Sequence, residues 1–201
     1  VWVAPSADPA AATRIPFTIS RGDVTGSWWS HETGHLVLSG GGAVAYWDLE
    51  EGATEGPLYG NRIIALSPRY PREALVTFED QLVRVSIDDK SKREFQEDMG
   101  FTQWYCDHEL RVRAGRRNLA NGNMQILVRD AEDEWRVHGE YDWQDTRVVG
   151  VLSVSADGDA VYLIDNKGRD KGALVKVDLA TEEETVLYED PLADLLPAGA
   201  T

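Results

Sequence analysis

Cysteine is almost absent from this sequence of 201 residues. The single Cys106 cannot form a disulfide within the chain, and no cysteines and histidines have the spacing of a zinc site. The sequence therefore predicts no disulfide scaffold, no metal and no cofactor. A chain with one cysteine is typical of a reducing compartment, so we expect a cytoplasmic protein.

Long hydrophobic runs are also missing. The clean apolar stretches, such as residues 148–152, are far shorter than the ~18 residues that a membrane helix needs. The sequence opens Val1-Trp2-Val3, with no charged segment before an apolar run, so no signal peptide is predicted. We expect no membrane partner, and the opening resembles the interior of a longer chain.

Positive charge is scarce. Lys and Arg number 20 against 35 Asp and Glu, which gives a formal net charge of −15. Nucleic acid is therefore not expected as a partner, because such a chain repels it at long range. With 42% hydrophobic and 27% charged residues the composition is that of a folded globular chain, and the length fits one domain.

Helical periodicity is nearly absent, whereas short β-branched and aromatic runs bounded by turn residues recur throughout. The sequence therefore predicts an all-β chain. The expected strands are Ser27–Ser30, His35–Ser39, Ala43–Leu49, Ile63–Leu66, Ala74–Glu79, Leu82–Ile87, Phe101–Cys106, Leu110–Ala114, Met124–Asp130, Glu134–Glu140, Val148–Ser155, Ala160–Asp165, Ala173–Leu179 and Thr185–Glu189.

These strands repeat. Four segments align on a strand and the turn that follows it, at Asp48, Ser86, Asp130 and Asp178, with spacings of 38, 44 and 48 residues. That range overlaps the ~40–50 residues of a four-stranded propeller blade. The period therefore indicates antiparallel four-stranded blades of a β-propeller.

About four blades and a remnant of a preceding blade are predicted within one partial propeller, residues 1–201. Trp2–Pro5 and Thr13–Thr18 have the character of the two outer strands of that preceding blade. A ring normally closes with ~4–8 blades, so we expect an incomplete ring whose exposed flanks allow self-association. The expected segments are the remnant 1–20, the blades 21–60, 61–99, 100–145 and 146–196, and a tail 197–201.

Part of the sequence resembles a known family. The run Ser153–Asp170 followed by Ala173–Thr181, the segment Asp107–Ala114 after Trp104, and Ala65–Arg69 are similar to the N-terminal propeller of prolyl oligopeptidase family serine peptidases. The likeness is to the acylaminoacyl peptidase and dipeptidyl aminopeptidase branch, and it covers roughly residues 61–195. Residues 40–60 are shorter than the family's blade, so this blade is expected to lack part of a hairpin.

The resemblance implies a function. In that family the propeller caps a C-terminal α/β-hydrolase domain, which carries Ser, Asp and His, and admits only short peptides. This chain has no Gly-x-Ser-x-Gly elbow, and Ser39 has glycine on one side only. We therefore assign no catalytic residue here. The expected role is to gate and position short peptides for a hydrolase domain of the parent chain.

One turn is the best candidate for a contact with substrate or with the hydrolase domain. It contains Asn166, Arg169 and Asp170, with Gly168 supplying a left-handed residue and Arg169 pairing with a carboxylate. The alternative is an ordinary hairpin in which Arg169 and Asp170 satisfy the backbone and each other.

Other polar groups favour structural interpretations. Asp107-His108-Glu109 could hold a base or ligand, but a polar turn is favoured because the residues supply no nucleophile except the adjacent Cys106. His31 and His35 are separated by a turn, which argues against a shared metal. Residues 182–184 are three consecutive glutamates, which we interpret as a solvated turn.

A second class of function stays open. Gly34-His35 and Trp47-Asp48 resemble the WD repeat signature, although the other repeats lack the pair. This supports, as the alternative, a stand-alone WD-like propeller module that binds a protein partner. An exposed aromatic pair such as Trp28-Trp29 could mark its binding surface.

Overall fold

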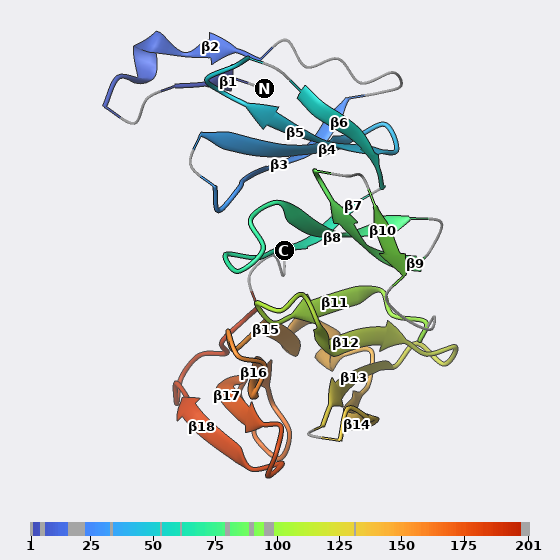
Figure 1. Cartoon of the computed structure of the whole chain (residues 1–201). Coiled ribbons are helices and arrows are strands. Elements are labelled where there is room, and N and C mark those ends of the chain that lie inside the picture. Colours follow the sequence, from blue (N-terminus) through green and yellow to red (C-terminus); the bar gives the residue numbers. More distant parts are fainter. Residues whose placement is uncertain are drawn as a thin grey trace. The chain divides into compact units, whose positions relative to one another are not determined.

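The computed structural model describes residues 2–4, 7–15, 23–32, 34–52, 54–60, 62–78, 81–88, 91–94, 99–130 and 132–197. The chain forms two compact units, residues 1–97 and residues 98–201. In both, the strands pair antiparallel with their neighbours in the chain (Figure 1).

The first unit contains a short hairpin and two four-stranded sheets. In the hairpin, Trp2 pairs with Arg14 and Val3 with Thr13, with a 3-10 turn between the two strands. The sheets have the orders β3-β4-β5-β6 and β10-β9-β8-β7. The elements are β1 (Trp2–Val3), η1 (Pro9–Ala11), β2 (Thr13–Arg14), β3 (Val24–Trp29), β4 (His35–Gly40), β5 (Ala43–Asp48), β6 (Thr54–Tyr59), β7 (Arg62–Leu66), β8 (Glu73–Phe78), β9 (Gln81–Ser86) and β10 (Lys92–Glu94).

The second unit contains two more four-stranded sheets, with the orders β11-β12-β13-β14 and β15-β16-β17-β18. A 3-10 turn lies on the connection between them. The elements are β11 (Gln103–Cys106), β12 (Val112–Asn118), β13 (Met124–Arg129), β14 (Trp135–Tyr141), η2 (Asp145–Arg147), β15 (Gly150–Val154), β16 (Ala160–Asp165), β17 (Ala173–Asp178) and β18 (Glu184–Tyr188).

The predicted fold class is confirmed. Over the described residues the chain is all-β, with four antiparallel sheets of four strands and a two-stranded N-terminal remnant. The prediction of a shortened first blade was wrong, because β6 completes that sheet, with Val44 opposite Leu58. The short strand β10 was also missed. The limits given above for the domain, its blades and the tail stay a prediction.

Turn chemistry explains why the hairpins form where they do. The connection between β4 and β5 is the pair Gly41-Gly42, flanked by the paired residues Gly40 and Ala43. Both turn glycines have positive φ, 55° and 79°. A two-residue hairpin turn needs this left-handed backbone to match the strand twist, and glycine adopts it without a steric penalty.

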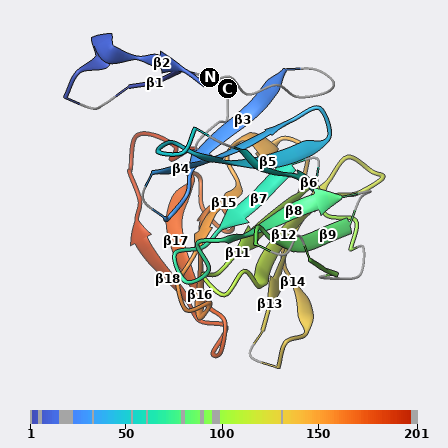
Figure 2. The same cartoon turned by 45° about the horizontal axis from the view of Figure 1, so that its top comes forward.

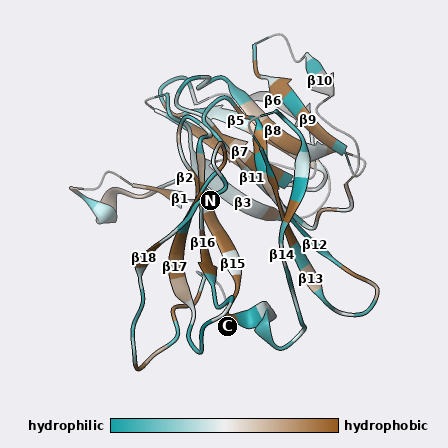
Figure 3. Ribbon diagram, turned by 90° about the horizontal axis from the view of Figure 1, so that it is seen from below, coloured by the Kyte–Doolittle hydropathy of each residue, from teal (hydrophilic) through white to brown (hydrophobic). Residues whose placement is uncertain are grey.

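The core of the second unit lies between its two sheets. On β17, Ala173, Val175 and Val177 are buried while Leu174 and Lys176 between them are half-buried. The alternation places one row of side chains against the neighbouring sheet. Strands β15, β16 and β17 are largely hydrophobic, and the turns at their ends are polar (Figure 3). The core also contains Ala114, Met124, Ile126, Val128, Tyr141, Val149, Val151, Val161, Leu163 and Leu179.

The first unit has two apolar clusters. One joins its two four-stranded sheets through residues such as Val37, Val44 and Val76. The other contains Ile15 and Trp47 and packs the N-terminal hairpin residue Val3 against the sheet of β3–β6. The hairpin strands β1 and β2 pair only with each other among the described strands (Figure 2).

Candidate functional site

The predicted turn follows β16 in the second unit. Gly168 has a φ of +70°, which confirms the left-handed residue expected there. The backbone N–H of Arg169 donates to the carbonyl of Asn166, 2.9 Å away, and closes the turn. The side chains of this turn extend from a strand whose last residue, Asp165, is completely buried.

Asp165 is the centre of a polar cluster. The hydroxyl of Tyr141 donates to its Oδ2 at 2.9 Å, and the backbone N–H of Lys167 donates to its Oδ1. Arg169 Nη1 lies 4.0 Å from the same Oδ1 and donates to the Asp165 carbonyl oxygen at 3.4 Å. The buried carboxylate is therefore satisfied by a phenol, a backbone amide and a guanidinium, as a buried charge requires.

His138 on β14 lies between two carboxylates. Its Nε2 is 3.7 Å from Asp165 Oδ2 and 3.8 Å from Glu184 Oε1, and its side chain is almost fully buried. Lys167 Nζ lies 3.5 Å from Glu184 Oε1. Within the described residues, His138 Nε2 has no hydrogen-bond partner. The imidazole is thus packed between the two carboxylates.

The cluster changes the acidity of its members. Burial alone raises the pKa of Asp165, but the contacts from His138, from the Lys167 N–H and from Tyr141 outweigh it, so the pKa lies below its ordinary value. Burial first, and the neighbouring Asp165 charge second, raise the pKa of Tyr141. Asp165 is therefore an anion and Tyr141 a neutral donor at neutral pH.

The three predicted site residues do not form one group. Arg169 lies beside Asp165 rather than Asp170. Asn166 Nδ2 donates to Asp145 Oδ1 at 2.7 Å and ties the turn to the 3-10 turn η2. The Asp170 side chain is 93% exposed and lies 3.4 Å from Lys171 Nζ. Their functional role stays a prediction.

The turn at Asp107 has a structural role. Asp107 is buried and accepts hydrogen bonds from the Arg111 backbone N–H at 2.9 Å and from Arg113 Nε at 2.8 Å. The backbone N–H of His108 donates to the carbonyl of Ala156, which joins two turns of the unit. Burial, together with the Asp107 charge, raises the pKa of the Cys106 thiol to about 12.

The run of glutamates lies at the turn before β18. Glu182 has a φ of +62°, and its Oε1 is 3.1 Å from Arg136 Nε. Glu184 begins the strand and faces Lys167 and His138 as described above. Glu182 and Glu184 are therefore paired with the cations Arg136 and Lys167 of the same unit.

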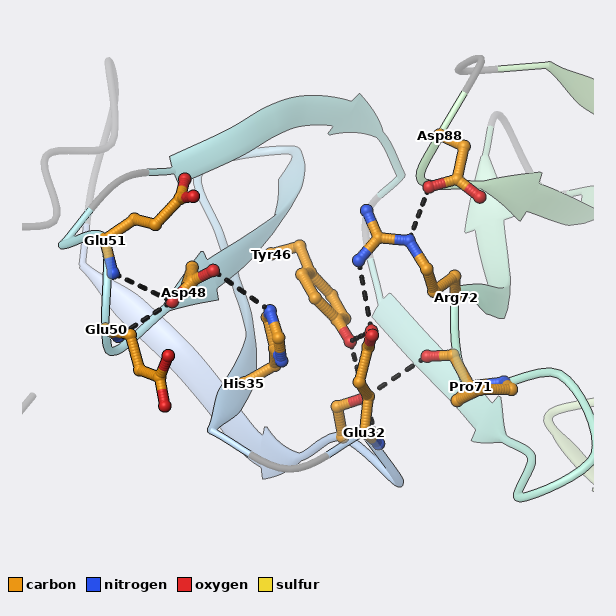
Figure 4. A network of polar contacts seen from close by, with 10 residues as sticks. Glu32, His35, Tyr46, Asp48, Glu50, Glu51, Pro71, Arg72 and Asp88 are labelled. Carbon is orange, nitrogen blue, oxygen red and sulfur yellow. Dashed lines mark hydrogen bonds and ion pairs between the residues drawn. The ribbon is translucent and has the colours of Figure 1, made fainter.

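In the first unit a polar network joins its two sheets (Figure 4). The Tyr46 hydroxyl donates to Glu32 Oε2 at 3.0 Å, and Arg72 Nη1 donates to the same oxygen at 3.1 Å. Arg72 Nε also binds Asp88, and Ser30 Oγ bonds to both Tyr46 and the Pro71 carbonyl. Arg72 thus bridges a carboxylate from each sheet.

This network holds its groups in fixed charge states. The hydrogen bond from Arg72 lowers the pKa of Glu32. Burial raises the pKa of Tyr46 to about 12, which keeps its hydroxyl a donor. Beside it, His35 Nε2 lies 3.3 Å from Asp48 Oδ2, and the His35 and Tyr46 rings are 4.9 Å apart.

The two WD-like dipeptides therefore meet on adjacent strands, with His35 directly opposite Asp48. The pKa of Asp48 is lowered, first by the N–H of Glu51 and then by that of Glu50 and the His35 charge. Asp48 binds those two N–H groups at 3.0 and 2.7 Å and so caps the turn after β5. The pair stabilises one hairpin.

Two further observations concern metal ligands and membrane spans. In the part of the chain that the structure describes, no three His, Cys, Asp or Glu side chains come together as metal ligands. Nor does any helix among those residues have the length and hydrophobicity of a membrane span. The polar clusters described above have their charges internally paired, as structural clusters do.

Comparison with known proteins identifies one related sequence and several similar folds. No protein-family model matches the chain. Dipeptidyl aminopeptidase BIII of Pseudoxanthomonas mexicana is 24% identical over 212 residues, which cover 97% of this chain and 31% of that protein. The chain thus spans about a third of the length of this curated relative.

Three solved structures share the fold. An oligogalacturonate lyase in complex with manganese has a TM-score of 0.56 at 11% identity, covering 80% of this chain and 50% of its own. The β-propeller domain of Cps50 (Swd1) from Myceliophteria thermophila has a TM-score of 0.54 at 17% identity, covering 90% and 61%. TolB from Acinetobacter baumannii has 0.51 at 15% identity, covering 85% and 44%.

These likenesses define the class of protein. The four-stranded sheets are β-propeller blades, and the sequence is related to part of a peptidase. The family resemblance found in the sequence is confirmed at that level. Membership of the acylaminoacyl peptidase and dipeptidyl aminopeptidase branch stays a prediction.

Proposed function

We propose that the chain is the propeller portion of a prolyl oligopeptidase-type serine peptidase, and that it admits and positions short peptides for an α/β-hydrolase domain. The observation that carries this proposal is the sequence similarity to a dipeptidyl aminopeptidase, which extends over 97% of the chain. The propeller blades agree with it. A reducing compartment, the cytoplasm, fits the single Cys106 with its protonated thiol.

The turn at Asn166, Arg169 and Asp170 is the proposed contact with the peptide or with the hydrolase domain. Its anchor is rigid, because Arg169 Nη1 is held by Asp165 and Asn166 is held by Asp145. Within the described residues the remaining donors of Arg169 are free for a further carboxylate. A cation fixed in this way can orient a carboxylate without first being ordered itself.

The test uses the complete product of the gene that encodes this chain. Peptides of about 3, 8 and 30 residues are compared by kcat/KM, with and without a serine-directed phosphonate. We expect phosphonate-sensitive cleavage that falls at least tenfold for the longest peptide, because entry is restricted. Cleavage that is insensitive to the phosphonate, or equal at all lengths, contradicts the proposal.

A matched pair of variants tests the turn. Arg169→Gln is expected to raise KM for short peptides several-fold, while Arg62→Gln, at an exposed arginine of the first unit, leaves it unchanged. Thermal midpoints of both variants show whether each is folded.

The isolated chain of 201 residues is expected to hydrolyse neither amides nor esters. If it shows turnover that the phosphonate abolishes, our assignment of no catalytic residue is contradicted.

A further inference from the structure

A cavity of about 580 Å³ lies in the first unit, between the N-terminal hairpin and the sheet of β3–β6. Cavities of this size are typical of sites for small ligands. The hairpin side includes Val3 and Arg14, and the sheet side includes Trp29, Trp47 and Leu49. The two walls come from elements that pack together through one apolar cluster.

The lining of the cavity is mostly apolar, with one charged residue among its described residues. Most of it is apolar, and two tryptophan side chains contribute: Trp47 is buried and Trp29 is 60% exposed. Trp29 is a large apolar side chain left open to water, which is typical of a binding surface rather than a core. The cavity therefore suits an aromatic or aliphatic group.

Arg14 is the only charged residue among the described residues that line the cavity. It is exposed, and within the described part of the chain it makes no hydrogen bond or ion pair. In a chain with a net charge of −15, Arg14 thus places a positive charge beside an apolar cavity, with no carboxylate partner among the described residues. A guanidinium binds a carboxylate through two parallel hydrogen bonds.

We propose that this cavity binds an apolar carboxylate, the C-terminal residue of a short peptide. The aromatic or aliphatic side chain packs against Trp29 and Trp47, and the terminal carboxylate pairs with Arg14. The site is contained in this chain and does not need a hydrolase domain. A negative binding result would therefore disprove this site without disproving the proposed peptidase function, and the reverse also holds.

The test is a calorimetric titration of the whole chain with N-acetyl-L-phenylalanine, with N-acetyl-L-phenylalaninamide and with octanoate. The amide lacks only the negative charge, so the acid is expected to bind about tenfold more tightly. Arg14→Gln removes that difference, and the matched change Arg147→Gln retains it. Equal binding of acid and amide overturns the proposal, and so does binding of octanoate without the amino acid derivative.

The apolar wall is tested separately. Trp29→Ala is expected to weaken both the acid and the amide about tenfold, and Ala11→Trp, which fills the cavity, is expected to abolish binding. Trp143→Ala removes an equally exposed tryptophan of the second unit and serves as the control. Far-ultraviolet circular dichroism verifies the fold of each variant. Unchanged binding in both Trp29→Ala and Ala11→Trp overturns the proposal.

Discussion

At the scale of single residues, the buried carboxylates determine most of the polar structure. Asp165 and Asp107 are both completely or almost completely buried, and each is paired with an arginine and with a backbone N–H. Removing the charge from such a group leaves its donors buried without a partner. Each aspartate is therefore more important for stability than its position beside a turn suggests.

Asp165→Asn is expected to destabilise the second unit by about 3 kcal/mol, because Tyr141, His138 and Arg169 lose a common anion. Urea unfolding followed by tryptophan fluorescence measures the change. Asp170→Asn, five residues further along and exposed, should leave the midpoint unchanged. Equal effects of the two substitutions contradict the structural role of Asp165.

The lowered pKa of Asp165 also predicts the direction in which stability changes with pH. A carboxylate with a folded-state pKa below its unfolded value adds stability at higher pH and loses that contribution as the pH falls through the folded pKa. Wild-type stability should therefore fall below about pH 4. Asp165→Asn should show a smaller fall over the same range, measured by thermal midpoints from pH 7 to pH 2.

Cys106 is expected to be unreactive in the folded chain. Its pKa of about 12 leaves roughly a thousandfold less thiolate at pH 8 than a cysteine of ordinary pKa 9.0. Its reaction with a disulfide reagent should be slow at pH 8 and become fast in 6 M guanidinium chloride. Rapid modification without denaturant contradicts the raised pKa of this thiol.

Several of these residue contacts could not be predicted from the sequence. Asp165 is the last residue of an apolar strand, and this change from apolar to polar is the only local sequence feature that marks it. Its partners Tyr141 and His138 are on a strand of another sheet, at positions that no motif connects to it. The contact of Arg169 with Asp165 lies within one turn, but the sequence pattern does not distinguish Asp165 from Asp170 as the neighbour of this arginine.

At the scale of elements, the turns impose the strictest requirements on residue type. Gly158 and Gly168 both have positive φ, 73° and 70°. A Cβ at Gly168 meets no other atom, whereas one at Gly158 falls 2.5 Å from Asp107 Oδ2 and 2.7 Å from Arg113 Nε. Gly168 is therefore required only for its backbone conformation, whereas Gly158 is required both for its backbone conformation and because a side chain would not fit.

This pair allows a controlled comparison. Gly168→Ala is expected to cost about 1 kcal/mol from backbone strain alone. Gly158→Ala should cost about 3 kcal/mol, since it also disturbs the buried Asp107–Arg113 pair. Urea unfolding of both variants measures the difference. Equal costs contradict the close approach at Gly158.

The predicted strands show where sequence patterns fail. Runs of β-branched and aromatic residues located the first three strands of each sheet well. The missed strands have no such run: Thr54–Tyr59 contains Gly56 and Pro57, and Lys92–Glu94 is entirely charged. Both are edge strands, which need no apolar face, so their pairing is determined by the neighbouring strand.

At the scale of the whole molecule, one exposed strand edge offers a surface for another chain. β18 is the edge strand of its sheet, and every residue of it is exposed, including Val186, Leu187 and Tyr188. An exposed apolar edge is a template for another chain. We propose that copies of this chain associate through it.

Sedimentation velocity over a hundredfold concentration range should therefore show concentration-dependent oligomers. The double substitution Val186→Lys and Tyr188→Lys places positive charge on the edge and should shift the population to monomer. Leu192→Lys, at an exposed site outside the strand, is the control. A monomer at all concentrations, or an equal effect of the control, contradicts association through β18.

The strand order within the sheets has a further consequence for synthesis on the ribosome. In all four sheets each strand pairs with the strand next to it in the chain, through a short connection. Every sheet is complete before the next one begins, so its contacts are local and its contact order is low. Each sheet can therefore form during translation, as soon as its fourth strand leaves the exit tunnel.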